Sequence, residues 1–158
     1  MRAHKSVLAG LFAFAALAGC AASPDAAAPA PAFAAPFALS AKDFDAAVAA
    51  VEAAASARGF TVVTRIDHAK SAAAAGLELR PLTVILFGNP KGGTPLMRED
   101  PLIGLYLPLR AAVFEQKDGS IGVAAPDMAQ LLAGRAAPPE AVARLNAVLK
   151  SVVEESAR

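Results

Sequence analysis

The 158-residue sequence has no tryptophan, one tyrosine, two histidines and a single cysteine, Cys20. One cysteine cannot form a disulfide within the chain. The only histidine outside the basic N-terminus is His68. A zinc site of the usual cysteine and histidine type and a covalently attached c-type haem are therefore excluded. We expect neither a metal nor a cofactor.

Residues 37–158 also have no excess of positive or negative charge. That part has thirteen Lys and Arg (fifteen less Arg2 and Lys5) and thirteen Asp and Glu (fourteen less Asp25). A nucleic-acid-binding protein needs a basic patch or stripe to neutralise phosphates. This sequence has no basic tract, so we expect no nucleic-acid partner.

The first nineteen residues have the pattern of an export signal. Arg2 and Lys5 give a basic start, and residues 7–17 (VLAGLFAFAAL) form an uncharged apolar run of eleven residues. This length is typical of a signal-peptide core, whereas a membrane-spanning helix needs ~20 residues. The pattern predicts a signal peptide over residues 1–19.

The end of this run, Leu17-Ala18-Gly19-Cys20, resembles the lipobox of bacterial lipoproteins. In that family the signal is cut before the cysteine, which then receives acyl chains such as palmitate. Two or more chains anchor a protein stably, whereas one binds a membrane only marginally. The resemblance implies a lipidated Cys20 and a periplasm-facing place in the cell envelope. The outer membrane is favoured over the inner because no aspartate adjoins Cys20. The alternative is an ordinary secretory signal with an incidental cysteine.

Residues 21–36 (AASPDAAAPAPAFAAP) contain mostly alanine and proline. Such a stretch has too little large apolar surface to fold, and its prolines keep it extended. It predicts a semi-rigid tether, so residues 20–36 are the lipidated cysteine and its tether. Residues 37–158 are long enough for one small domain with a single core.

Within the domain, helix and strand signals are mixed. Ser40 and Asp43 predict a capping box, with Ser40 as the cap of a helix that runs through Ala55 and stops at Gly59. Strict alternation predicts a half-buried strand from Phe60 to Ile66, in which Phe60, Val62, Thr64 and Ile66 share one face.

The later elements follow from the same signals. Asp67 can cap a short helix that Gly76 closes, and strands are expected at 82–87, 107–114 and 121–125, with a hairpin turn at 118–119. A helical turn at 128–132 and a last helix after Pro138-Pro139 complete the chain. Helices at both ends and most strands between them predict an α+β fold. We expect one mainly antiparallel sheet with helices on one face.

Residues 88–94 (GNPKGGT) have the outline of a phosphate-binding loop. A true phosphate loop has a lysine after its second glycine, where this chain has Thr94. Pro90 and Pro95 also lack the N–H groups that would bind phosphate. We interpret Asn89-Pro90 and Thr94-Pro95 as two helix starts, each a capping side chain followed by proline, joined by a sharp turn at Gly92-Gly93. On this interpretation the segment is a scaffold turn.

The remaining polar candidates are assigned to ligand binding, and no residue is assigned to catalysis. They are His68, Asn89, Lys91 and Thr94. Asp67 and His68 fit a helix start, and no GxSxG elbow is present for a serine hydrolase. An enzyme of an undescribed kind that uses Asp67, His68 and Lys91 is the alternative.

Three stretches resemble the bacterial and archaeal domain-of-unknown-function 302 family. They are RGFTVVTRIDHAKSAAAAGLELRP, ILFGNPKGGTPLM and LYLPLRAAVFEQKDGSIGV, which with the preceding helix cover most of residues 40–127. The resemblance implies a compact α+β domain of β-α-β-β-β-β-α-like order, with a curved antiparallel sheet packed on helices and no established activity. Many relatives have an acidic residue just before LPL, where this chain has Tyr106. A family site that used this carboxylate would be altered here.

These features favour a lipid-anchored, non-catalytic envelope domain that binds a small molecule or a partner protein. A further hypothesis is a structural lipoprotein that self-associates through a sheet edge, for instance as a homodimer.

The lipobox gives a direct prediction for Cys20. Replacing Cys20 with alanine removes the sulfur that takes the diacylglycerol. We expect Cys20→Ala to lose labelling by a radioactive or clickable palmitate and to accumulate as precursor or released protein. Normal processing and full membrane retention of this variant would contradict the lipoprotein assignment.

Overall fold

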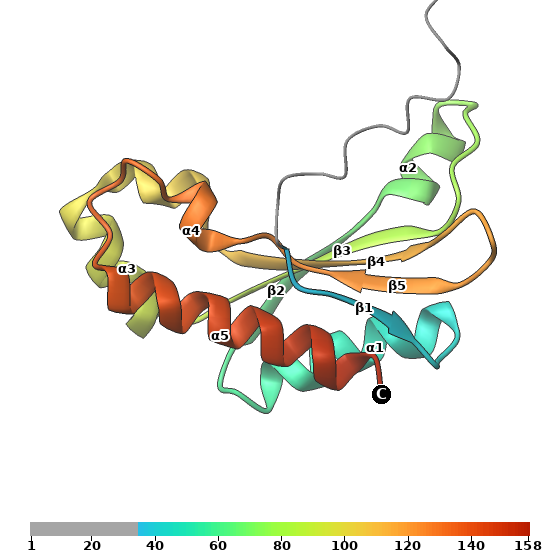
Figure 1. The fold of residues 1–158 in the computed structure, drawn as a ribbon. Helices are drawn as coiled ribbons and strands as arrows, with labels where there is room; N and C mark the ends of the chain where they lie inside the picture. The colour runs from blue at the N-terminus through green and yellow to red at the C-terminus, as the bar shows by residue number, and fades with distance from the viewer. Residues whose placement is uncertain (1–34) are drawn as a thin grey trace, which may run out of the picture. The chain divides into compact units, whose positions relative to one another are not determined.

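The computed structural model describes residues 35–158 (Figure 1). The predicted signal peptide, Cys20 and the tether up to residue 34 lie outside the described residues. The elements follow in the order β1 (Phe37–Ser40), α1 (Phe44–Ser56), β2 (Thr61–Asp67), α2 (His68–Ala74), β3 (Leu82–Gly88), α3 (Pro90–Glu99), the 3-10 helix η1 (Pro101–Leu105), β4 (Leu109–Glu115), β5 (Ile121–Ala124), α4 (Met128–Leu131) and α5 (Pro139–Ser156).

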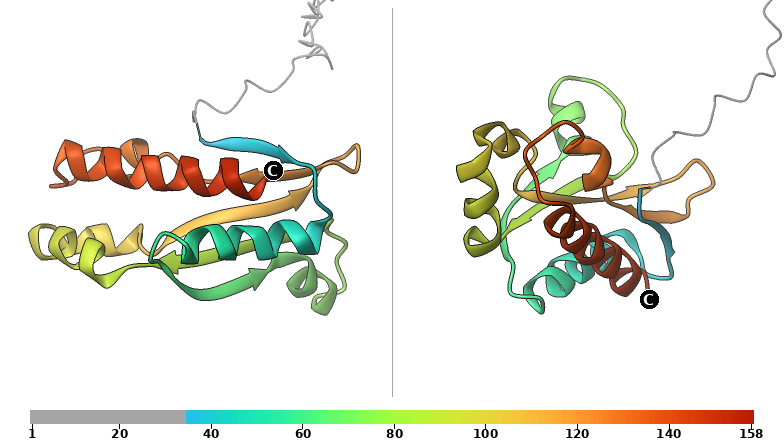
Figure 2. Two further views of the ribbon diagram at one scale, coloured as in Figure 1. Left: turned by 90° about the horizontal axis from the view of Figure 1, so that it is seen from below. Right: turned by 60° about the vertical axis from the view of Figure 1, so that its left-hand side comes forward.

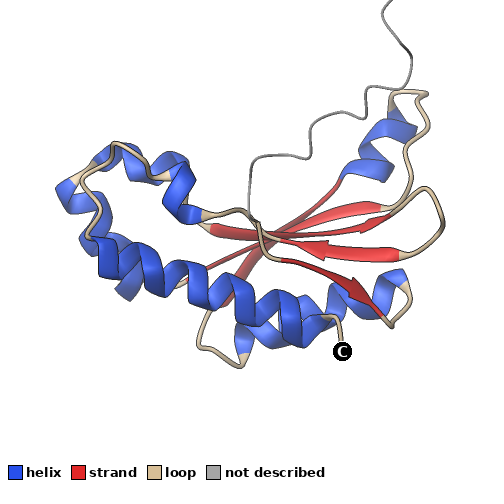
Figure 3. Ribbon diagram, in the orientation of Figure 1, coloured by secondary structure: helices blue, strands red, loops and turns tan. Residues whose placement is uncertain are grey.

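The five strands form one antiparallel sheet in the order β1-β5-β4-β3-β2. The long helices α1 and α5 lie side by side on one face of it (Figures 1 and 2). Figure 3 shows these two layers, with α2 beyond one end of the strands and α3 beyond the other. The predicted α+β fold with an antiparallel sheet and helices on one face is confirmed.

The core fills the space between the sheet and these two helices. Ile85 and Phe87 of β3, Val113 of β4 and Val123 of β5 have no exposed surface, and they alternate with residues that are less buried. The helices contribute fully buried side chains in return, among them Val51, Leu149, Val152 and Val153. Burying each large side chain contributes about 1.5–3 kcal/mol, so this layer contact stabilises the domain most.

The first helix starts later than the capping box predicts. Asp43, not Ser40, is its cap, and the Asp43 carboxylate accepts a hydrogen bond of 2.8 Å from the Ala46 N–H. Ser40 is the last residue of β1, where it lies opposite Ile121, and its hydroxyl accepts from the Lys42 N–H. Because Ser40 belongs to the strand, the helix cannot begin until the chain has turned.

Two other differences concern strand ends. The family order implied a strand before the first helix, but the residues themselves did not place β1, because four residues next to an Ala/Pro-rich stretch are too short to show a period. The strand predicted from residue 107 begins at Leu109. Pro108, the residue just before it, has no N–H for the ladder.

A β-bulge changes which side of β2 is buried. Val62 lies opposite Phe87 but Thr64 lies opposite Leu86, so Val63 is an extra residue in the strand. After the bulge the alternation is inverted, and Ile66 lies opposite Val84 on the sheet face away from α1 and α5. The prediction that Val62 and Ile66 share one face is wrong for this reason.

Arg58, two residues after the end of α1, connects α1 to α5. Its guanidinium donates to the Ala54 carbonyl at 2.8 Å and to the Ser151 hydroxyl at 2.6 Å, and it pairs with the Glu155 carboxylate. The hydrogen bond from Arg58 and the charge of Arg58 hold the pKa of Glu155 below its ordinary value.

The position of β1 predicts where the chain can be shortened. The Pro36 carbonyl accepts a bond from the Ala125 N–H, so a chain that begins at Ala35 keeps every sheet contact. We expect it to unfold with the sharp thermal transition of the full chain. A chain that begins at Ala41 lacks β1 and should melt at a lower temperature. Circular dichroism melting tests this, and a large loss of stability in the Ala35 chain would show that residues before it pack on the domain.

Candidate functional site

The segment from Gly88 to Thr94 is a strand end and one helix start. Asn89 caps α3, and its side-chain oxygen accepts from the Lys91 N–H at 3.0 Å. Its amide nitrogen donates to the Gly59 carbonyl at 3.1 Å, on the loop that leads into β2. Asn89 therefore joins the start of β2 to the start of α3.

The backbone donors of this turn are already used. The Lys91 N–H bonds the Asn89 side chain, and the N–H groups of Gly92 and Gly93 bond the Asn89 carbonyl at 3.0 and 3.1 Å. Pro90 has no N–H to offer. A phosphate loop needs such groups free and pointing at the ligand. The first turn of α3 therefore does not form a phosphate cradle.

The second predicted helix start, at Thr94-Pro95, is wrong. Both residues lie inside α3, and Gly92-Gly93 is helical and does not form a sharp turn. Proline inside a helix removes one hydrogen bond, but α3 is held at both ends. At its C-terminal end, Asp100 accepts from the Leu102 N–H at 3.0 Å and from the Ala136 N–H at 3.3 Å, and it lies 3.6 Å from the Arg135 guanidinium.

A cleft of about 560 Å³ lies between α3 and the adjoining end of the sheet. We call it the loop cleft. Apolar side chains from four parts of the fold line most of it: the start of β2, α3, the segment before β4, and α5. They include Phe60, Val63, Met97, Leu107 and Leu145, with loop 88–90 closing one side.

Small and fixed residues keep the loop cleft open. Gly93 lies against its wall, where a Cβ atom would come within 3.3 Å of Leu107 Cδ1. Phe60 is fixed by an edge-on contact with Phe87, with ring centroids 5.8 Å apart. Val63, the bulge residue, is 60% exposed although it is apolar. No titratable side chain is among the described residues that line the cleft, and its lining is mostly apolar.

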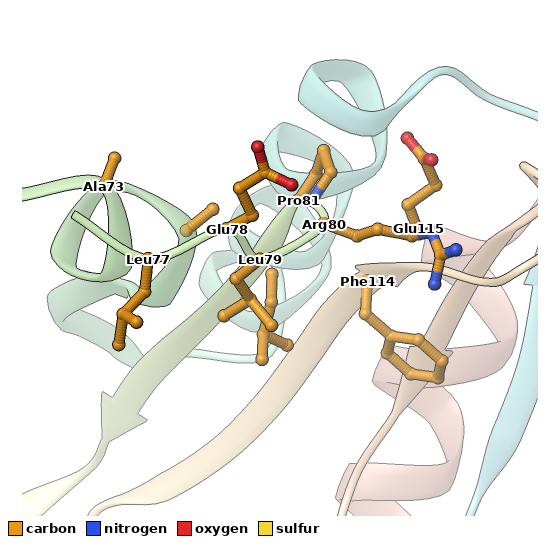
Figure 4. A pocket seen from close by; sticks show the side chains of 10 residues that line it. Ala73, Leu77, Glu78, Leu79, Arg80, Pro81, Phe114 and Glu115 are labelled. Carbon is orange, nitrogen blue, oxygen red and sulfur yellow. The ribbon is translucent and has the colours of Figure 1, made fainter. Parts of the chain in front are cut away.

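A second hollow of about 970 Å³ lies at the opposite end of the sheet, and we call it the α2 groove. Residues of α2, the segment 77–81 and the end of β4 line it. Figure 4 shows Leu77, Leu79 and Phe114 pointing one way and the carboxylates of Glu78 and Glu115 pointing the other.

The predicted ligand-binding residues divide between these two ends. Asn89 lines the loop cleft, and Lys91 and Thr94 are exposed on α3 beside residues that line it. His68 begins α2 at the far end of β2. Since β2 and β3 pair from Thr61–Gly88 to Asp67–Thr83, the two ends are roughly 20 Å apart.

Asp67 and His68 are thus not brought to Lys91, and the three residues share no site. The Asp67 carboxylate accepts a bond of 2.8 Å from the Lys70 N–H as the cap of α2. This confirms the interpretation of these residues as a helix start. Tyr106 packs partly buried against the core, and its carbonyl accepts from the Arg110 guanidinium at 3.1 Å.

The apolar wall of the loop cleft was not predicted from the sequence. Met97, Leu107 and Leu145 are ordinary apolar residues in separate segments, and only the fold brings them together. The predicted alternation sets Val63 on the face opposite Val62, but nothing in the sequence places it in the wall of a cleft.

Residues 35–158 contain neither a candidate metal cluster nor a candidate membrane-spanning helix. In this part of the chain, His, Cys, Asp and Glu side chains nowhere gather in threes around a position that could hold a metal ion. No helix there combines the length and the hydropathy that a bilayer crossing requires.

The fold and the cleft define a two-layer α+β domain with an apolar cleft at one end of its sheet. Residues 37–156 match the model of the family described as domain of unknown function DUF302, and the chain belongs to that family. Its fold is similar to the crystal structure of an uncharacterized conserved DUF302 protein from Bacillus stearothermophilus, with a TM-score of 0.71. The two are 18% identical, and the match covers 77% of this chain and 96% of the other.

Curated relatives match a shorter stretch. The fluoride-specific ion channel FluC 1 of Brucella suis biovar 1 (strain 1330) is 44% identical over 81 residues, which is 51% of this chain and 32% of that protein. FluC 1 of Brucella abortus biovar 1 (strain 9-941) is 44% identical over 81 residues, 30% of its length. The chain thus spans less than a third of the curated relatives it matches.

Mutation can separate the structural role of Asn89 in the α3 turn from a nucleotide-binding role of Lys91. Asn89→Ala removes a helix cap and the bond to Gly59, so we expect it to lower the free energy of unfolding by ~1–2 kcal/mol. Lys91→Ala should leave it nearly unchanged, because an exposed lysine contributes little. ATP and GTP should not raise the melting temperature of the unmodified chain. A nucleotide-dependent stabilisation that is lost in Lys91→Ala would contradict the scaffold interpretation.

Proposed function

We propose that this protein is a lipid-anchored, non-catalytic domain of the cell envelope that binds a small apolar or amphiphilic molecule in the loop cleft. The observation that carries the proposal is the cleft itself. Its volume, about 560 Å³, lies within the ~300–1,000 Å³ of ligand sites, and its lining is mostly apolar as theirs is.

The lining also favours a class of ligand. Burial of an apolar chain between Val63, Met97 and Leu145 needs no polar partner, so the hydrophobic effect supplies the affinity. The Asn89 side chain is occupied by Gly59 and Lys91, and it shapes the wall of the cleft. Lys91 and Thr94 are exposed and adjoin the cleft-lining residues of α3 in sequence. They suit a polar or anionic head group, and we propose that an amphiphile binds with its apolar part inward.

The proposed anchor is consistent with such a ligand. Acylation of Cys20 would hold the domain, through a short tether, next to a membrane where amphiphiles are concentrated. Fluoride conduction, named for the curated relatives, is not part of the proposal, because the matched stretch is less than a third of those proteins.

The test uses dodecanoate and dodecanol as probes of the full chain. A ligand at a hundredfold excess over its Kd stabilises the folded state by ~2.7 kcal/mol, so binding is visible as a higher melting temperature. Val63→Asn places a polar amide on the cleft wall and should weaken both probes by roughly fivefold, or ~1 kcal/mol of lost apolar burial. Lys91→Ala should weaken dodecanoate more than dodecanol.

Leu105→Asn is the matched control. Leu105 is 72% exposed and lies outside the loop cleft, so the same kind of change there should leave both affinities unaltered. The proposal fails if neither probe stabilises the chain, or if Val63→Asn binds both as tightly as the unmodified protein.

A further inference from the structure

The sheet face opposite α1 and α5 has no described helix across it, and we call it the open face (Figures 1 and 3). Alternate residues of a strand share a face, so the register decides which side chains lie there. One row of paired residues crosses all five strands on this face. It consists of Phe37, Ala124, Ala112, Val84 and Ile66.

Every member of this row is apolar. An antiparallel sheet with one face in water normally alternates apolar residues inward with polar residues outward. Here the open face carries this wholly apolar row, beside a row that contains Thr64 and Arg110. Phe37 is 53% exposed, Leu39 in the next row 58%, and Ile66 40%.

The aromatic residues on this face form a fixed cluster. The rings of Phe37 and Phe114 lie with centroids 6.2 Å apart. Both pack over Gly122, where a Cβ atom would come within 2.7 Å of Phe114 Cζ and 3.0 Å of Phe37 Cε2. The absence of a side chain at Gly122 therefore allows a close-packed aromatic surface to form on the outside of the sheet.

Charge is nearly absent from the open face. By the strand register, Arg110 is its only charged residue within the described strands. The Arg110 guanidinium donates to the Tyr106 carbonyl of its own chain. Two copies of this face could meet with no other like charges opposed.

The apolar area continues into the α2 groove. Phe114 and Leu82 belong to both surfaces, and Leu77 and Leu79 extend the patch with 66% and 48% of their surface exposed (Figure 4). The charged residues Glu78, Arg80 and Glu115 also line the groove. An apolar centre with a polar rim is the usual build of a protein interface.

We propose that the open face is the contact surface of a homodimer, in which it packs against the open face of a second copy of this chain. Three strands of seven residues and two of four, ~4.8 Å apart, give a face of roughly 20 Å across the strands and roughly 13–23 Å along them. Its accessible area is larger than this projection because side chains stand out from the sheet. Together with the exposed leucines of the α2 groove, the face offers each copy a continuous apolar surface to bury, and stable complexes bury ~600–1,000 Å² per partner. A two-fold axis is the simplest arrangement that buries one surface twice.

Native mass spectrometry of the full chain in a mild detergent tests the proposal, because it reports the number of copies and any retained lipid together. We expect two copies for the unmodified chain. Leu39→Glu, at the exposed edge of the face, and Ala112→Glu, at its centre, should give single copies, since a carboxylate there would be buried against the partner. Leu105→Glu places the same charge on an exposed leucine elsewhere and should remain dimeric.

Far-ultraviolet circular dichroism of each variant should match that of the unmodified chain, which separates loss of the dimer from loss of the fold. Leu39→Glu is the more conservative of the two because its side chain is already largely in water. A single copy of the unmodified chain would overturn the proposal, whether free or carrying a lipid. So would a dimer that persists in both face variants, or one that forms only after removal of residues 1–34.

Discussion

A single layer of helices covers one face of the sheet, while the other face also carries a row of apolar residues, and the rest of the structure follows from this constraint. The helix side supplies the core, with Ile85, Phe87 and Val113 fully buried against α1 and α5. The fold is complete once this layer contact is made. The helix layer leaves the other face and the ends of the sheet uncovered. We propose that ligand binding and dimer contact occur there. Large contiguous apolar patches are rare on monomers, and we propose that a second copy of the chain covers this face.

The ends of the sheet differ because different connections leave them. At one end, α3 is fixed by Asn89 at its start and by Asp100 at its finish, which leaves an apolar cleft between the helix and the sheet. At the other, the segment after α2 leaves Leu77 and Leu79 exposed beside Phe114. The loop cleft is the smaller of the two hollows and suits a small molecule. The other merges with the open face and suits a protein surface. The candidates Asp67 and His68 lie at the start of α2, where the Asp67 carboxylate caps the helix.

Much of this fold could be predicted from the sequence because its elements carry local signals. Residues close together in the sequence indicate the apolar period of α5, the Asp67 cap and the turn before β5. The cap of α1 was placed three residues early, and the inverted face of β2 was missed, because β1 pairing and the Val63 bulge are tertiary features. For the site, Asn89 was found by its turn chemistry, whereas Met97 and Leu145 look like any core residues. They form one wall of the loop cleft only because the fold packs their separate segments together.

The claim that the loop cleft holds a ligand is tested most directly by a crystal structure of the full chain purified from bacterial membranes without delipidation. The account predicts continuous elongated density between Val63 and Met97, with any polar end near Lys91. A cleft closed by the Met97 and Leu145 side chains, with no space left for a ligand, would contradict it.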